Sequence, residues 1–165
     1  MYIFILLYIY IYMSSRTQRI TRKPVRKNRK TMKNTSTKHQ LTQAVRKQII
    51  HKFLTILNCV KVYHWSTTSY SQHKATDMLY EDLNKHIDAF VEIMLAKTNK
   101  RISNTQISTC NVPNKVEFVK KATGFKQYLY GLNRYMDPVL DSNLYNIRDE
   151  MLGVVDQLLY LFQLK

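Results

Sequence analysis

The chain has 165 residues, 45% hydrophobic and 12% aromatic, which is enough for one domain with a buried core and too short for two comfortable ones. Its charge is unbalanced, with 26 Lys and Arg against 11 Asp and Glu. Three glycines and three prolines disfavour a β-sandwich or a doubly wound α/β fold, because both consume turn residues. Two cysteines, Cys59 and Cys110, exclude a disulfide scaffold and a four-thiolate zinc site, and we interpret them as free thiols of an intracellular, reducing compartment.

The first segment, residues 1–13, is an apolar run. Tyr2 to Tyr12 reads YIFILLYIYIY, whereas a helix across a bilayer needs about 20 apolar residues. The flanks that a signal peptide requires are absent. Such a run is also typical of translated AT-rich DNA, so we expect translation to begin at Met13, with interfacial anchoring as the alternative. No transmembrane span is predicted.

The second segment, residues 14–38, is a basic tail. It contains no acidic residue and almost nothing to bury, so we expect it to be disordered. Such a tail neutralises phosphates and binds DNA without sequence specificity, through counterion release. A solubilising or nuclear-targeting tail is the alternative. The residues expected to contact DNA are Arg16, Arg19, Arg22, Lys23, Arg26, Lys27, Arg29, Lys30, Lys33 and Lys38.

The third segment, residues 39–165, retains a net charge of only about +5 and contains four amphipathic stretches. Apolar steps of three and four predict helices over 40–65, 71–97 and 114–136, and a last helix that Asp141 or Ser142 can cap and that carries apolar residues from Leu144 to Leu161. The long polar stretch 98–113 is a connection. Two helices, a long connection and two helices predict an all-α fold, an antiparallel four-helix bundle with a long crossover, as in ferritin-like folds. The predicted buried stripes are Val45, Ile49, Phe53, Leu57 and Val60; Leu79, Leu83, Ile87, Phe90 and Met94; Val119, Phe125, Leu129 and Leu132; and Leu144, Ile147, Met151, Val154, Leu158 and Leu161.

The second predicted helix carries ligand-type residues on one face. His73 and Asp77 are four residues apart, as are Asp88 and Glu92, and all four fall within an arc of about 100°. Imidazoles and carboxylates without a thiolate suit iron, with manganese or zinc as alternatives. The two pairs lie roughly 22 Å apart along the axis, so they are separate half-sites or halves that a second copy completes in an antiparallel dimer. A polar face without ligands is the other interpretation, because further acids lie on this helix.

The sequence His64-Trp65, followed by His73-x3-Asp77 and then Asp88-x3-Glu92, resembles the Dps-like mini-ferritins over residues 49–95. The resemblance implies a ferritin-like bundle that is a ferroxidase, oxidising Fe(II) with peroxide or dioxygen. It implies that His64, His73 and Asp77 of one subunit meet Asp88 and Glu92 of its partner. It also implies a homo-oligomer, a dodecameric shell that stores ferric mineral, and DNA binding by the tail.

The AT-rich coding DNA that the apolar run suggests is similar to that of Dps-like proteins predicted in large DNA viruses. The expected location is therefore the cytoplasm or nucleoid, or the host cytoplasm or virion. The alternative function is a non-enzymatic nucleoprotein or virion component that uses the bundle only as an assembly platform. We expect Trp65 to pack against the chain, His51 and His86 to be ordinary, partly exposed histidines, and Cys59 to act as a small buried hydrophobe.

Overall fold

The computed structural model describes residues 41–164, so the predictions for the apolar run and the basic tail lie outside the described residues. Residues 41–164 contain four α-helices and one 3-10 helix and no strand, which confirms the all-α fold. No helix in this range is long and apolar enough to cross a bilayer. The elements are α2 (Gln43–Ser66), α3 (Tyr70–Thr98), α4 (Lys115–Gly131), η1 (Leu132–Tyr135) and α5 (Ser142–Leu161).

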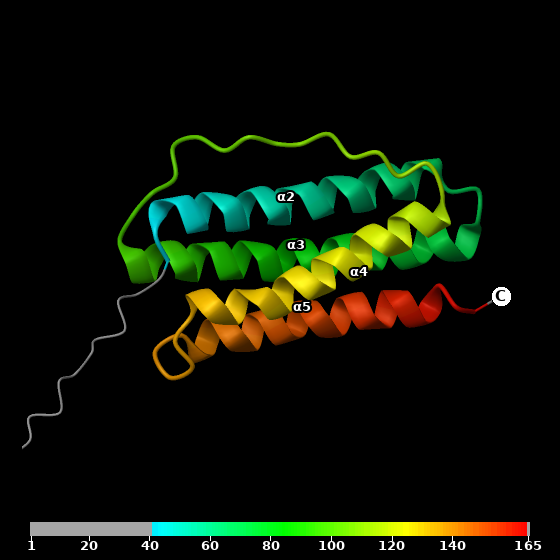
Figure 1. Ribbon diagram of the computed structural model, residues 1–165. Helices are drawn as coiled ribbons and strands as arrows, with labels where there is room; N and C mark the ends of the chain where they lie inside the picture. The colour runs from blue at the N-terminus through cyan, green and yellow to red at the C-terminus, as the bar shows by residue number, and fades with distance from the viewer. Residues whose placement is uncertain (1–40, 165) are drawn as a thin grey trace, which may run out of the picture. The chain divides into compact units, whose positions relative to one another are not determined.

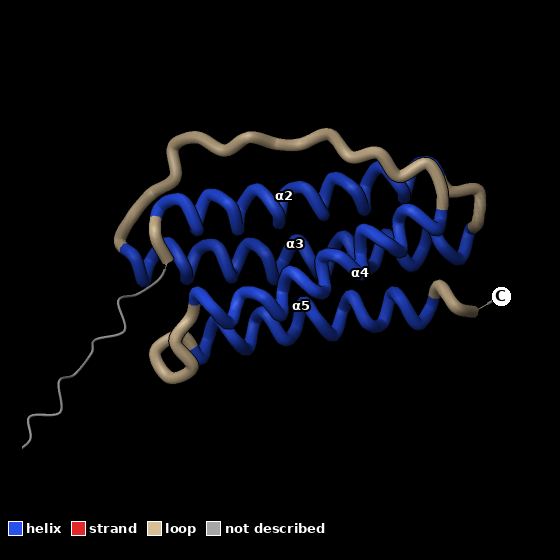
Figure 2. Tube along the Cα trace, in the orientation of Figure 1, coloured by secondary structure: helices blue, strands red, loops and turns tan. Residues whose placement is uncertain are grey.

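The four helices lie lengthwise beside one another around one core. Helix α3 packs between α2 and α5, and α4 packs between α5 and α2. Helices α2 and α5 run in one direction, and α3 and α4 run in the other (Figure 1). Residues 99–114, here called the crossover, follow the length of α2 without helix or strand of their own (Figure 2). The predicted connection between the second and third helices is therefore confirmed.

Side-chain caps account for where α2, α3 and α4 begin. Thr42, Ser69 and Asn114 each accept a hydrogen bond from the backbone amide three residues ahead, which satisfies one of the unpaired amides of the first turn. Helix α4 ends earlier than predicted, at Gly131, and continues as η1 to Tyr135. Pro138 has no amide proton to continue a helix, so the helical path does not extend past this residue.

The core centres on three phenylalanines from three helices. The ring of Phe53 on α2 meets Phe90 of α3 edge-on at 5.3 Å and Phe125 of α4 at 6.0 Å. Such edge-to-face pairs add to the stabilisation from burial alone. All five stripe residues predicted on the second helix are buried, so the face of α3 beside its ligand-type residues is fixed in the core.

The predicted stripes of α4 and α5 were partly wrong. On α4, Phe118 is fully buried and Val119 only half-buried. The buried row of this helix runs through Phe118, Ala122, Phe125 and Leu129, and the predicted stripe omitted its first two residues. On α5, Ile147, Val154 and Leu161 are half-buried, as is Val45 on α2. Helix α5 has neighbours on two sides, so its buried arc is wider than the predicted stripe and includes Arg148, Leu152 and Val155.

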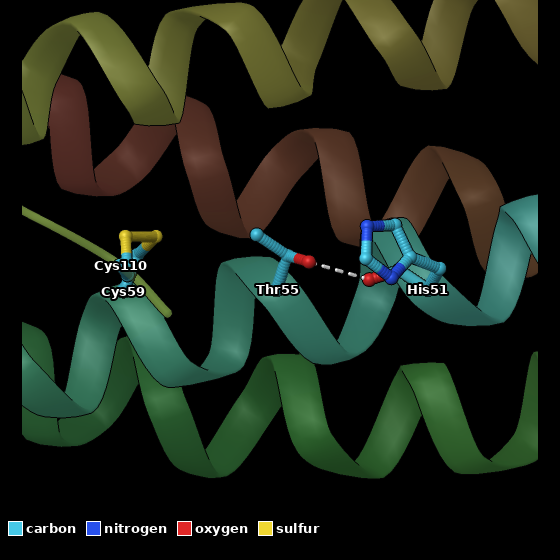
Figure 3. The surroundings of a disulfide bond; sticks show 4 residues. All are labelled: His51, Thr55, Cys59 and Cys110. Carbon is cyan, nitrogen blue, oxygen red and sulfur yellow. Dashed lines mark hydrogen bonds between the residues drawn. A yellow bond between two sulfur atoms is a disulfide. The ribbon is translucent and has the colours of Figure 1, made fainter. Parts of the chain in front are cut away.

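The prediction of two free thiols was wrong. Cys59 of α2 and Cys110 of the crossover form a disulfide, with their Cα atoms 5.2 Å apart (Figure 3). The two residues are 51 positions apart in the sequence, and only the path of the crossover along α2 brings them together. Because disulfides persist in oxidising surroundings, the cysteines no longer support a reducing compartment.

Candidate metal centre

The turn between α2 and α3 brings three of the predicted ligands together. Residues 67–69 reverse the chain, so that the last turn of α2 lies against the first turn of α3. Gln72 fixes this hairpin, because its side-chain oxygen accepts hydrogen bonds from the Tyr63 hydroxyl at 2.5 Å and the Thr67 hydroxyl at 3.2 Å. The register that results places His64 beside His73.

His64 and His73 bond to each other's backbone. His64 Nδ1 lies 3.1 Å from the carbonyl oxygen of His73, and His73 Nδ1 lies 3.0 Å from the carbonyl oxygen of His64. A carbonyl oxygen can only accept, so each Nδ1 carries the proton and donates it. The two rings stack with their centroids 3.8 Å apart. In a neutral ring this arrangement leaves Nε2 with its lone pair, which is the atom that binds a metal.

Thr76 belongs to the same cluster, although no sequence pattern marks it. Its side chain is fully buried, and its hydroxyl donates to the carbonyl oxygens of Gln72 at 2.8 Å and His73 at 3.0 Å. The same hydroxyl lies 3.3 Å from His64 Nδ1. The only available signal was its position three residues after His73, which acquires meaning once the hairpin register is known. Thr76 thus helps to hold both imidazoles in place.

Asp77 lies one turn after His73 and faces the same cluster. Its Oδ1 is 3.9 Å from His64 Nε2, and about half of its side chain is exposed, whereas His64 is buried. This separation is too long for a direct hydrogen bond, so the carboxylate does not occupy the lone pair of Nε2. The structure therefore brings together His64, His73 and Asp77, with two imidazoles and one carboxylate at the edge of the bundle.

Asp88 and Glu92 lie elsewhere on α3. Both are exposed, and neither has an ion pair or a side-chain hydrogen bond within residues 41–164. Glu92 borders a cavity of about 320 Å³ that Lys100 and Arg101 also line. As expected from the helical rise, one chain does not bring these carboxylates to the histidines. His64, His73 and Asp77 are neighbours, but in the described part of a single chain neither they nor any other three His, Cys, Asp and Glu residues are placed to hold a metal ion by themselves.

The prediction that Trp65 packs against the chain was wrong. Its side chain is 72% exposed, and its described neighbour is Lys61, whose Nζ lies 5.9 Å from the ring centroid. Trp65 follows His64 directly at the end of α2, so the helix turns one ring into the cluster and the other away from the bundle. An exposed indole beside the cluster is available to a second surface.

The comparisons with known proteins match the part of the chain that begins at this cluster. The DUF5856 family profile, described as a family of unknown function, covers residues 64–162, more than half of the chain. The chain belongs to the DUF5856 family. The DUF5856 match starts at His64 and ends at Phe162, so it contains all five predicted ligands and helices α3 to α5. No curated protein and no solved structure matches the chain.

Proposed function

We propose that the chain is a Dps-like protein that binds and oxidises Fe(II) at a site shared between two subunits, and that it contacts DNA through its basic tail. The observation that carries the metal site is the reciprocal bonding of His64 and His73. Histidines that bind metals almost always donate their other ring N–H to a carbonyl or a carboxylate, which fixes the tautomer and the ring orientation. Both imidazoles of the cluster have that support.

The sharing of the site between subunits rests on the length of α3. The two pairs of ligand-type residues are centred about 15 residues apart, roughly 22 Å along the helix, so one chain cannot use both for one ion. In an antiparallel two-fold dimer, His73 and Asp77 of one subunit would face Asp88 and Glu92 of the other. The exposure of Asp77, Asp88 and Glu92 supports this arrangement, because all three carboxylates are open to a partner.

The fold supports the same proposal. Helices α2 and α3 form a hairpin, the crossover runs the length of the bundle, and α4 and α5 form a second hairpin. This is the connectivity of ferritin-like bundles with one long crossover. We propose that dimers of this bundle assemble further into a hollow, dodecameric shell.

The ligand set fits the proposed chemistry. Fe(II) is the substrate, and neutral imidazoles with carboxylates bind it, as they also bind manganese or zinc. Two Fe(II) ions give two electrons to one peroxide molecule, which takes up two protons and leaves as two waters. The role of the chain is to hold the ions at fixed positions and to orient both imidazoles through their Nδ1 contacts with backbone carbonyls, which leaves Nε2 as the metal-binding atom.

DNA contact would come from the ten cations between Arg16 and Lys38, which lie outside the described residues. Neutralising six to ten phosphates makes binding fall about 10³–10⁵-fold between 50 and 200 mM salt. Replacing all ten cations with Gln in the full chain should remove most of the affinity and flatten that salt dependence in gel-shift assays. Equal affinity for both proteins would place DNA binding on the bundle instead. DNA contact agrees with a location in the nucleoid, the host cytoplasm or a virion.

Complementation between subunits tests the shared metal site. His73→Asn keeps a donor close to the position of Nδ1 and removes Nε2, and Asp88→Asn keeps the shape of the side chain and removes its charge. Anaerobic Fe(II) titration should show no tight site in either variant alone. A mixed dimer of the two variants contains one intact site, so mixing them should restore up to half of the tight sites of the unaltered protein.

Glu81→Gln is the matched control, because Glu81 is an exposed acid on the same helix without a proposed ligand role. It should bind Fe(II) like the unaltered protein. Tight binding that is lost in each variant and not restored by mixing would contradict the shared site. No saturable binding by the folded, unaltered protein would favour the assembly-platform function.

A further inference from the structure

A second candidate site lies on another side of the bundle, between α2 and α4. The structure has a cavity of about 710 Å³ there, which is within the range of small-molecule sites. Its apolar part contains Ile56, Phe125 and the sulfur-bearing Cys59, all buried. The cavity is separate from the histidine cluster, so a ligand bound in it would not depend on the proposed metal site.

The cavity exists partly because α4 has a glycine in its wall. Gly124 lies in the middle of α4, and a Cβ added there would meet no atom of the described chain within 4 Å apart from its own helix. Glycine inside a helix is destabilising relative to alanine, so the local preference of the helix is for a larger residue. On the opposite wall, the Thr55 hydroxyl donates to the carbonyl oxygen of His51 at 2.7 Å (Figure 3), so its proton is not available to a ligand.

The rim of the cavity is positively charged. Lys52 of α2 and Lys120 and Lys121 of α4 line it, against one acidic residue, Glu117. All three lysines are exposed, and none has an ion pair within residues 41–164, so their ammonium groups are free to meet an anion. Three cations above an apolar floor are complementary to a molecule with a negative head and an apolar body.

Tyr128 adds an unused donor to the wall. Its hydroxyl is buried and has no hydrogen-bond partner within residues 41–164. A buried hydroxyl without a partner is unfavourable, and a ligand atom that accepts its proton would satisfy it. Burial raises the pKa of Tyr128 to about 12, so the hydroxyl keeps its proton at neutral pH and can donate it.

We propose that this cavity binds a long-chain carboxylic acid as its anion. The acyl chain would lie on Ile56 and Phe125, and the carboxylate would lie among Lys52, Lys120 and Lys121. A small inorganic anion would leave the apolar floor uncovered, and an uncharged lipid would leave the three ammonium groups unmatched. An amphiphilic anion satisfies both parts of the cavity.

The test uses the full chain and dodecanoate below its micelle concentration, with dodecanol and inorganic phosphate as comparison ligands. Isothermal titration calorimetry should show saturable binding of dodecanoate, at least about tenfold weaker binding of dodecanol, and no binding of phosphate in this cavity. Amide signals of residues 52–59 and 117–128 should shift in a two-dimensional NMR titration. Shifts confined to other residues would overturn the proposal.

Two variants with matched controls complete the test. Gly124→Leu fills the cavity and should abolish dodecanoate binding, whereas Gly153→Leu, at a helical glycine of α5 that is equally open, should leave it unchanged. The double variant Lys120→Gln with Lys121→Gln should weaken binding about tenfold, and Lys85→Gln on α3 should not. Equal binding by Gly124→Leu and Gly153→Leu, or tight binding of phosphate instead of dodecanoate, would refute an amphiphile site.

Discussion

The two ends of α2 use histidine in different ways. Near its beginning, His51 has both ring nitrogens occupied by the crossover, with Nδ1 2.7 Å from the Gln106 carbonyl oxygen and Nε2 3.2 Å from the Ser108 hydroxyl. At its end, His64 uses Nδ1 for the His73 carbonyl, and its Nε2 lies 3.9 Å from Asp77 Oδ1, too far for a hydrogen bond. The second ring nitrogen therefore distinguishes a histidine that fastens a loop from one whose Nε2 makes no hydrogen bond within the described residues.

The crossover and the hairpin are also attached to α2 in different ways. The crossover is fastened to α2 by His51 and by the disulfide between Cys59 and Cys110, and its only buried hydrophobic residue is Val112. The hairpin end is held by hydrogen bonds among side chains and backbone around His64 and His73. We expect the attachment of the crossover to depend on a covalent bond and the attachment of the hairpin to depend on packing and polar contacts.

Removing the disulfide should have the largest effect. Cys110→Ser frees a loop of 51 residues, and the loss of this constraint on the unfolded chain costs about 4 kcal/mol in the free energy of unfolding. Urea unfolding under oxidising conditions measures it. Reduction of the unaltered protein should give the same loss, and neither treatment should change Fe(II) affinity at the hairpin end. A loss below about 1 kcal/mol would mean that noncovalent contacts hold the crossover.

The sequence predicted the parts of the molecule that depend on local periodicity. Steps of three and four residues located all four helices, and the four-residue spacing of His73 and Asp77 placed them on one face of α3. The disulfide was missed because no local pattern marks a contact across 51 residues. The exposure of Trp65 was missed because burial on the last turn of a helix depends on neighbours that only the tertiary fold supplies.

The candidate site was predictable only as a set of residues. The sequence named His64, yet its bond to the His73 carbonyl depends on the register of the hairpin, which the side chain of Gln72 helps to fix. The role of Thr76 is hidden for the same reason, because a threonine inside a helix has no distinctive pattern. The predicted stripe of α5, in which three of six residues are only half-buried, shows the reverse case: its spacing was regular, and the neighbours of the helix widened the buried arc.

The next largest effect should be the difference in Fe(II) affinity between variants of His73 and His51. His73→Asn should weaken binding of Fe(II) at least about 100-fold, because losing a partner of a ligand already costs 10–100-fold. His51→Asn makes the same chemical change on α2 and should leave affinity within about twofold. Anaerobic titration of both variants gives the comparison. If both lose affinity equally, the free second nitrogen does not identify a ligand.

A smaller difference is expected between the free energies of unfolding of His64 and His51 variants. His64→Ala removes a buried ring and leaves its bonding partners in the cluster incomplete, which should lower the free energy of unfolding by about 1–3 kcal/mol. His51 is half-buried and water can replace its contacts, so His51→Ala should cost less than about 1 kcal/mol. Denaturant unfolding of both variants without metal measures the difference, and the reverse order would place the more important polar contact at the crossover.

The smallest expected effect is on the stability of Asp88→Asn. Asp88 is exposed and has no ion pair or side-chain hydrogen bond in the described chain, so the free energy of unfolding of the metal-free protein should change by less than about 0.5 kcal/mol. If the same variant also loses tight Fe(II) binding, the carboxylate binds the metal and does not stabilise the fold. That combination could not arise from partial unfolding, because partial unfolding would lower stability as well. A stability loss above about 1 kcal/mol would show that Asp88 has a structural partner. Repeating the measurement across protein concentrations would then test whether this partner lies in a second subunit.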